Sequence, residues 1–233
     1  MPALPAHIVR IIEATPRSRL LGIDLGRNAF VFGAGQAVVI GPRGATELKP
    51  YSIATSPARL AAEHLMEVLI AVDAPGEDFG WMHPGATIDV DGPFGTFTLP
   101  SQIHQPRVLF VAGGTGIAPI RAMLDDILSR NPRPQVSLLY SARRADEFAF
   151  ITELEEHVRA GILELHQTVT REDMSWHGRR GRIGRVEFEA VMHEPADTLC
   201  FVCGPPAMVE GAVTMLGALG VPNSSIRTEQ WGK

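Results

Sequence analysis

The sequence predicts a two-domain protein in which a small antiparallel β-barrel precedes an α/β domain built on a parallel sheet. Short strand-like segments with little helix run to about residue 99, and apolar strands alternate with helical segments from residue 107 onward. A length of 233 residues is enough for two domains of roughly 100 residues each. We place the boundary near residues 100–106 and assign residues 1–101 and 102–233 to the two domains.

Five segments of the first domain have the residue types of strands and are separated by turns rich in proline and glycine. Ile88 and Val90 alternate with Asp89 and Asp91, which is typical of a strand with one face in water. Short strands repeated in this way indicate a small antiparallel barrel. The predicted strands are residues 8–12, 20–25, 37–40, 65–72 and 86–90.

The second domain opens on its most informative stretch, residues 107–119. A continuous apolar run at 108–112 predicts a strand covered on both faces, and Gly113-Gly-Thr-Gly116 ends it with a tight turn. Pro119 then suits the first turn of a helix over 119–129. Free N–H groups and the helix dipole face such a loop, so we expect a nucleotide phosphate there. Proline replaces the third glycine of the usual dinucleotide fingerprint, and a glycine turn alone is often only a connection.

Strands and helices continue to alternate after this loop, which predicts a parallel sheet with helices on both faces. Gly161 is a natural cap for the helix that precedes it. The predicted strands are residues 136–140, 163–169 and 199–203, and the predicted helices are residues 146–159, 186–193 and 206–219.

Composition excludes several classes of protein. With 45% hydrophobic and 20% charged residues the chain is typical of a soluble globular protein. The sequence contains no apolar run of the ~18 residues that a membrane helix needs, and its start does not resemble a secretory signal. We therefore expect a cytoplasmic protein without membrane insertion. A net charge of −5 predicts no nucleic-acid partner.

The cysteines and histidines predict no metal site. Cys200 and Cys203 form a C-x-x-C pattern, but they lie in a predicted strand, where positions three apart point to opposite faces. The two cysteines are too few for an iron–sulfur centre, and no two of the eight histidines pair at ligand spacing on one element. The chain also lacks the Gly-x-Ser-x-Gly turn of many hydrolases.

Residues 49–56 combine a cation, an aromatic ring and three hydroxyl groups, the groups that a flavin needs, although an ordinary strand with a surface lysine has the same composition. Four motifs in order then resemble the ferredoxin–NADP reductase superfamily, flavin reductases with a FAD barrel before a pyridine-nucleotide domain. They are Lys49-Pro-Tyr-Ser52, Gly92-Pro-Phe-Gly-Thr-Phe97, Gly113-Gly-Thr-Gly-Ile-Ala-Pro119 and Cys203-Gly-Pro-Pro206. The resemblance covers nearly the whole chain.

This resemblance implies roles for the residues of the barrel. Tyr51 is expected against the flavin ring and Ser52 near the flavin N5 atom. Lys49 replaces the arginine of the family's Arg-x-Tyr-Ser motif, so it keeps the charge for the flavin phosphate but loses the planar fork. The remaining residues expected to bind the flavin are Pro50, Gly92, Gly95 and Thr96.

The family usually holds the FAD pyrophosphate with a glycine, a hydroxyl residue and a short helix before its Pro-Gly turn. Here residues 75–83 are short and acidic and contain no serine or threonine. Gly76 and Gly80 still offer backbone N–H groups, whereas Glu77 and Asp78 would repel a pyrophosphate that they faced. We expect FAD as the cofactor, with FMN as the less favoured alternative.

In the second domain the resemblance implies a site for the nicotinamide. Cys203 is expected beside the nicotinamide C4 atom, and Ser52, Cys203 and Glu229 are expected to shape the hydride-transfer site. Trp231 matches the aromatic residue that covers the flavin until nicotinamide displaces it, a packing tryptophan being the alternative. The other residues expected to bind the nucleotide here are Gly114, Thr115, Gly116, Pro119, Gly204 and Pro205.

Three arginines follow strands of the second domain at positions that resemble those with which the family binds a 2′-phosphate. Arg143, Arg171 and Arg182 favour NADPH over NADH, because an acid after the second strand would instead hold the free 2′-hydroxyl. The alternative for each of these arginines is that it is only a solvated surface residue. The electron donor is therefore expected to be NADPH or NADH.

The sequence as a whole predicts a flavin-dependent oxidoreductase that passes hydride from NAD(P)H to bound FAD. Electrons would then leave for a separate acceptor, a redox protein such as ferredoxin or an oxygenase component. Two alternatives stand beside this prediction. One is a non-catalytic or electron-transfer subunit of a larger redox complex with weakened flavin binding, and the other is a nucleotide-binding sensor.

Overall fold

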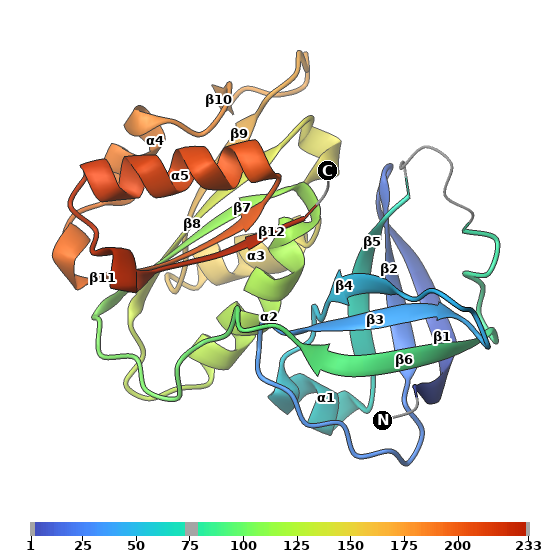
Figure 1. The fold of residues 1–233 in the computed structure, drawn as a ribbon. Helices are drawn as coiled ribbons and strands as arrows, with labels where there is room; N and C mark the ends of the chain where they lie inside the picture. The colour runs from blue at the N-terminus through green and yellow to red at the C-terminus, as the bar shows by residue number, and fades with distance from the viewer. Residues whose placement is uncertain (1–2, 73–78, 232–233) are drawn as a thin grey trace. The chain divides into compact units, whose positions relative to one another are not determined.

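The computed structural model of the chain describes residues 3–72 and 79–231 (Figure 1). Contacts between Cα atoms divide the chain into two compact units. The first consists of residues 1–99 together with 121–129, and the second of residues 100–120 together with 130–233. The chain therefore returns to the first unit for nine residues before it completes the second.

Within the described residues, six antiparallel strands form the first unit, in the order β4-β3-β6-β1-β2-β5. A bridge between Ile53 and Val68 joins the residue after β4 to β5, so the sheet closes on itself and the predicted barrel is confirmed. The strands are β1 (Leu4–Thr15), β2 (Ser18–Asp24), β3 (Ala37–Pro42), β4 (Lys49–Ser52), β5 (Met66–Ala71) and β6 (Thr87–Phe94).

The barrel core is aliphatic and follows the alternation of the strands. Ile88 and Val90 of β6 are fully buried, while Asp89 and Asp91 are partly exposed, as the alternating pattern predicts. Ile8 of β1 and Leu21 of β2 are also fully buried. Burial of such side chains is the main force that holds a small barrel together.

Helix α1 (Pro57–Glu63) is absent from the sequence prediction. Its start has a local cause, because the Ser56 hydroxyl accepts the Arg59 N–H and Pro57 occupies the first turn. It ends at His64, which adopts the left-handed conformation with φ of 55°. Seven residues are too few to show an apolar period, so the pattern that reveals longer helices is missing here.

The described part of the second unit forms a six-stranded sheet in the order β10-β9-β8-β7-β11-β12, with these strands paired in parallel, as predicted. Its strands are β7 (Arg107–Gly113), β8 (Gln135–Ala142), β9 (Glu164–Val169), β10 (Arg179–Arg180), β11 (Thr198–Gly204) and β12 (Ile226–Gln230). Its helices are α3 (Ile151–Arg159), α4 (Arg185–Val191) and α5 (Pro206–Ala218), and α2 (Ile117–Leu128) continues from it into the first unit. Figure 1 shows α4 and α5 on one face of the sheet and α3 on the other.

Two helix starts differ from the sequence prediction. Helix α2 begins at Ile117, after a 3₁₀ turn at Gly114–Gly116, so Pro119 lies in its first turn but does not start it. The helix predicted over 146–159 is a 3₁₀ turn at Ala145–Glu147 followed by α3. It is interrupted because the Ala149 N–H bonds the Tyr140 hydroxyl, and Phe148 is buried against the Tyr140 ring.

Candidate active site

The glycine loop connects strand β7 to α2 and is shaped by close contact with β11. A Cβ atom on Gly116 would lie 2.3 Å from the carbonyl oxygen of Cys203, so no side chain fits there. Gly114 has φ of +55°, and a Cβ atom added to it would meet nothing within 4 Å, so the loop is open on that side. The loop is therefore closed toward β11 and open at Gly114.

Tyr140 of β8 supports this loop, although no sequence pattern singles it out. Its hydroxyl donates to the Gly114 carbonyl at 3.3 Å and accepts the Ala149 N–H at 3.1 Å. Burial raises the pKa of the Tyr140 hydroxyl well above its ordinary value. The hydroxyl therefore stays protonated and remains available as the donor to Gly114.

The carboxyl ends of β7 and β11 approach each other closely beside the loop. A Cβ atom on Gly204 would lie 3.2 Å from the Cα atom of Gly113, and a Cβ on either glycine would lie 2.6 Å from the Met208 side chain of α5. A larger residue at either position would have to displace Met208, so both positions favour glycine. Pro205, which follows, is exposed and precedes the first turn of α5.

Cys203 and Glu229 occupy paired positions on β11 and β12, so their side chains share one face of the sheet. The Cys203 Sγ lies 3.9 Å from Glu229 Oε2, and the Trp231 indole N–H donates to the same oxygen at 2.8 Å. The Trp231 backbone N–H also donates to the Gly204 carbonyl at 3.1 Å. These contacts bring three predicted site residues together at the end of the sheet.

The Cys203 thiol is kept neutral by its surroundings. Burial and, to a smaller extent, the Glu229 carboxylate raise the pKa of this thiol well above its ordinary value. Cys200, three residues earlier, belongs to the same core cluster as Val111 and Val202, and burial raises its pKa to about 12. Both cysteines are free.

The three predicted 2′-phosphate arginines lie along the carboxyl ends of β8, β9 and β10. The Arg171 N–H donates to the Arg143 carbonyl at 3.0 Å, which places these two residues side by side. Arg182 follows β10, next to Gly181, whose N–H donates to the carbonyl of Val169 at the end of β9. All three arginines are exposed.

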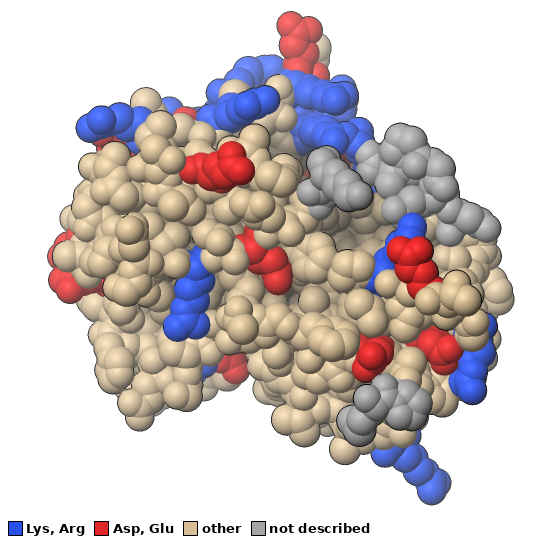
Figure 2. Space-filling view, in the orientation of Figure 1, with Lys and Arg blue, Asp and Glu red and all other residues tan. Residues whose placement is uncertain are grey.

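Arginine side chains gather around this edge of the sheet. Figure 2 shows arginine side chains concentrated over the part of the second unit that carries β10 and α4. Asp173 organises the segment between β9 and β10, and no motif in the sequence marks it. It accepts from the Ser175 hydroxyl at 2.6 Å and from the Ala145 N–H at 2.8 Å. The arginines in and around this segment are Arg143, Arg144, Arg171, Arg179, Arg180, Arg182 and Arg185.

In the barrel unit, the Lys49–Ser52 motif forms strand β4, an outer strand of the sheet that pairs with β3 among the described strands. Lys49 and Pro50 are exposed, Tyr51 is partly buried against the barrel core, and Ser52 is buried. A cation, a ring and a hydroxyl thus follow one another along an outer strand.

The Gly92–Phe97 motif lies on the other side of β3 from the Lys49–Ser52 motif. Ala37 pairs with Ser52 on one side and with Phe94 on the other, so β3 holds both predicted flavin motifs next to each other. Gln36, which sequence reasoning missed, secures this arrangement. Its side chain donates to the Gly95 carbonyl at 3.0 Å, and its backbone carbonyl accepts the Ile53 N–H at 2.9 Å. Gly95 is exposed, as is Thr96 beside it.

The segment expected to approach the FAD pyrophosphate is described only in part. Gly76, Glu77 and Asp78 lie outside the described residues. Gly80 is described and is exposed. The repulsion expected from the two acidic residues therefore stays a prediction.

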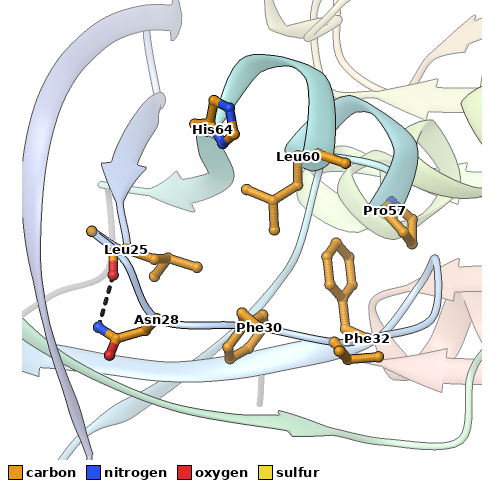
Figure 3. A pocket seen from close by; sticks show the side chains of 10 residues that line it. Leu25, Asn28, Phe30, Phe32, Pro57, Leu60 and His64 are labelled. Carbon is orange, nitrogen blue, oxygen red and sulfur yellow. Dashed lines mark hydrogen bonds between the residues drawn. The ribbon is translucent and has the colours of Figure 1, made fainter.

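A pocket of ≈ 320 Å³ on the barrel unit is lined by none of the predicted site residues. Figure 3 shows Phe32 and Leu60 facing each other across it, with Phe30 and Leu25 alongside and His64 at the rim. The Asn28 side chain donates to the Leu25 carbonyl at 2.8 Å and fixes the loop that forms one wall. The lining of the pocket is thus mainly apolar, and it includes no residue of the predicted flavin motifs.

The fold and these sites together define a flavin- and nucleotide-binding reductase, and comparison with known proteins identifies the family. Residues 110–214 match the family model of the oxidoreductase NAD-binding domain. Ferredoxin–NADP reductase B of Sorangium cellulosum is 31% identical over 97% of this chain and 96% of its own length. The chain belongs to the ferredoxin–NADP reductase family, whose members are FAD- and NAD(P)H-binding oxidoreductases.

Solved structures agree with this assignment. The cytochrome P450 reductase of Amycolatopsis matches with a TM-score of 0.84 at 25% identity, covering 97% of this chain and 69% of that one. A ferredoxin NADP+ reductase from Neisseria gonorrhoeae, solved with FAD and NADP, has the same fold, with a TM-score of 0.83 at 22% identity over 99% of both chains. None of the described helices is long and apolar enough to cross a membrane.

Proposed function

We propose that this protein passes hydride from NAD(P)H to bound FAD and then delivers electrons to a separate redox protein, such as a ferredoxin or an oxygenase component. The observation that carries the proposal is the group formed by Cys203, Glu229 and Trp231 beside the glycine loop. It supplies a neutral thiol, a carboxylate and an aromatic ring in fixed positions at the end of a nucleotide-binding sheet. FAD supplies the hydride acceptor when it is bound.

The residues of β4 fit a flavin in their chemistry. Lys49 offers an exposed cation for a phosphate, and the Tyr51 ring offers a flat surface beside it. Ser52 offers a hydroxyl donor from a buried, well-fixed position. Gly95 and Thr96 lie across β3 and add backbone donors and a second hydroxyl. These groups would bind and orient the flavin without taking part in proton transfer.

The second unit would orient the nucleotide. Gly114 leaves the loop open for a phosphate, while Thr115, Gly116 and Pro119 set the start of α2 against it. Arg143, Arg171 and Arg182 would bind a 2′-phosphate, and this favours NADPH over NADH. Gly204 and Pro205 would shape the space beside Cys203.

The nicotinamide gains a positive charge when it loses hydride, and the Glu229 carboxylate would stabilise that charge. Trp231 holds the carboxylate through its indole N–H and would lie over the flavin in the absence of nicotinamide. The Cys203 thiol, being protonated, adds a small neutral group that fills space beside the nicotinamide without adding charge.

Cys203→Ser is expected to slow reduction of the flavin by NADPH about tenfold in a stopped-flow experiment. This corresponds to an increase of about 1.4 kcal/mol in the activation free energy, because the nicotinamide would be less well positioned. The flavin should stay bound, because Cys203 belongs to the nucleotide sheet and β4 to the barrel. The absorbance of the flavin before mixing measures its content, and the decay after mixing with NADPH measures the rate. An unchanged rate would count against this role of Cys203.

The visible spectrum of the purified protein under anaerobic conditions tests the proposal directly. A yellow protein bleached by NADPH, and less effectively by NADH, is the expected result. Reoxidation by an iron–sulfur ferredoxin, compared with ferricyanide as a general acceptor, then tests the delivery of electrons to a protein. A protein that stays colourless after FAD and FMN are supplied would overturn the proposal in favour of a flavin-free subunit.

A further inference from the structure

The barrel unit contains a buried ion pair that the reaction scheme above does not use. Arg121 of α2 donates from Nη1 to Glu67 Oε2 of β5 at 2.7 Å. The two side chains are 7% and 5% exposed. Arg10 of β1, which is about half exposed, donates to the other Glu67 oxygen at 2.6 Å. One carboxylate is therefore shared by two guanidinium groups from different elements.

The same guanidinium also binds the main chain just after the flavin motif. Arg121 Nη1 donates to the Ala54 carbonyl at 3.1 Å, two residues beyond Ser52. Glu67 completes the attachment through its backbone, because its carbonyl accepts the Ala54 N–H at 2.8 Å and its N–H donates to the Thr55 hydroxyl at 2.7 Å. The segment that continues β4 is thus held both by the Arg121 side chain and by the backbone of β5.

Stability alone is a poor explanation for this arrangement. Removing two charges from water is costly, and a buried ion pair often adds no more stability than apolar residues of the same volume. The geometry is nevertheless specific, because one guanidinium nitrogen, Nη1, donates to a carboxylate and to a carbonyl at once. Such an arrangement fixes the position of the Ala54 main chain relative to Arg121 and Glu67.

We propose that Arg121 is a positioning residue that fixes strand β4 and its flavin-binding side chains through Ala54 and Glu67. This inference rests on the proposed function, since it assigns a role toward the flavin that β4 would hold. Arg121 lies four residues after Ile117, where α2 begins at the glycine loop. The helix that starts at the nucleotide loop therefore carries the group that fixes the flavin strand.

The test compares three variants of the full-length protein. Arg121→Met keeps an unbranched chain but is shorter and removes both contacts, whereas Arg121→Lys keeps the charge on a shorter chain without the planar guanidinium. Arg59→Met is the matched control. Arg59 pairs with Asp125 of α2 at 3.2 Å, so the control breaks another arginine–carboxylate contact between α2 and the barrel without touching Ala54 or Glu67. Each apoprotein is titrated with FAD, and the visible circular dichroism of the bound flavin is recorded.

Arg121→Met is expected to weaken FAD binding about tenfold, the equivalent of losing one charge-assisted hydrogen bond. The circular dichroism of the flavin should change with it, and NADPH-driven reduction should slow. Arg121→Lys should fall between wild type and Arg121→Met, and Arg59→Met should stay within about twofold of wild type because its ion pair is more exposed. If Arg121→Met does not fold, the Arg121→Lys variant decides the matter by the same three measurements.

Two results would overturn the inference in distinguishable ways. Wild-type FAD affinity and dichroism in both Arg121 variants, with only a lowered melting temperature, would leave Arg121 as a structural residue and the proposed function intact. Absence of FAD binding by the wild-type protein would overturn the proposed function itself, and the positioning role with it.

Discussion

The surroundings of Cys203 remove the reactivity of its thiol. Burial and the neighbouring Glu229 carboxylate both oppose the thiolate, and Cys200 is buried in the core. The thiolate is the form that reacts with alkylating agents. The proposed role of such a thiol is to fill space beside the nicotinamide as a small neutral group.

Both cysteines are therefore expected to resist iodoacetamide at pH 8 in the native protein. Labelling should be at least about a hundredfold slower than in urea-unfolded protein, because a raised pKa leaves little thiolate and burial blocks access to it. Mass spectrometry over time measures the rate. Fast labelling of Cys203 in the native state would contradict the description of a buried, protonated thiol.

The arginines at the ends of β8 to β10 lead to a second prediction at the scale of residues. Arg171→Ala is expected to raise the KM for NADPH about tenfold or more, since a charge-assisted hydrogen bond to a phosphate contributes about 1.5–3 kcal/mol. The KM for NADH should change little, because NADH lacks the 2′-phosphate. Steady-state kinetics with both donors provide the measurement, and Arg159→Ala at the exposed end of α3 is a control. Equal loss with both donors would argue against a 2′-phosphate site.

At the scale of elements, the segment between β9 and β10 depends on one carboxylate. Hydrogen bonds from the Ser175 hydroxyl and the Ala145 N–H lower the pKa of Asp173 from 3.8 to about 2. Because the pKa is lower in the folded state, the stabilisation is complete above the unfolded value and is lost as pH falls through the folded one. Asp173 thus ties the 3₁₀ turn after β8 to the arginine-bearing segment.

Asp173→Asn is expected to destabilise the protein at pH 7, and the difference from wild type should shrink between about pH 4 and pH 2 as the wild-type carboxyl is protonated. Urea unfolding at a series of pH values measures this difference. A difference that stays constant down to the lowest pH of the series would show that the carboxylate charge is not what matters.

Replacing a glycine by alanine is expected to have opposite effects on stability at α2 and at α5. Gly116→Ala just before α2 is expected to destabilise by roughly 1–3 kcal/mol, because its Cβ would lie 2.3 Å from the Cys203 carbonyl oxygen. Gly211→Ala inside α5 is expected to stabilise by about 0.5–1 kcal/mol, since nothing lies within 4 Å of the new atom and alanine favours a helix. Thermal unfolding followed by circular dichroism measures both. Similar effects of the two substitutions would mean that the loop tolerates more than its geometry suggests.

Sequence patterns predicted the long, strongly patterned elements and missed those with another cause. The apolar run of β7 and the alternation of β6 were sufficient by themselves. By contrast, β12 is an edge strand with the polar sequence Ile226–Gln230, and β10 has only two residues, so neither carries a pattern. The roles of Gln36 and Tyr140 could not be predicted, because their contacts join segments far apart in the chain and spacing along one segment does not reveal such contacts.

At the scale of the whole molecule, two sheets of opposite type each bring separate motifs together. In the antiparallel sheet, β3 lies between the two predicted flavin motifs, and in the parallel sheet the ends of β7, β11 and β12 meet beside the glycine loop. The motifs were recognisable in the sequence because each is local. Their juxtaposition follows from strand order, which the sequence indicated only through the family resemblance.

The division of the chain also has a consequence for recombination between relatives. Residues 121–129 cluster with the barrel although they follow the first strand of the second unit in the sequence. A hybrid reductase joined near residue 100 would therefore receive Arg121 from one parent and Glu67 from the other. Crossovers that carry residues 121–129 along with their own barrel should yield working hybrids more often. Exchange of these reductase modules, in the laboratory or over generations, would be limited by that short stretch of helix.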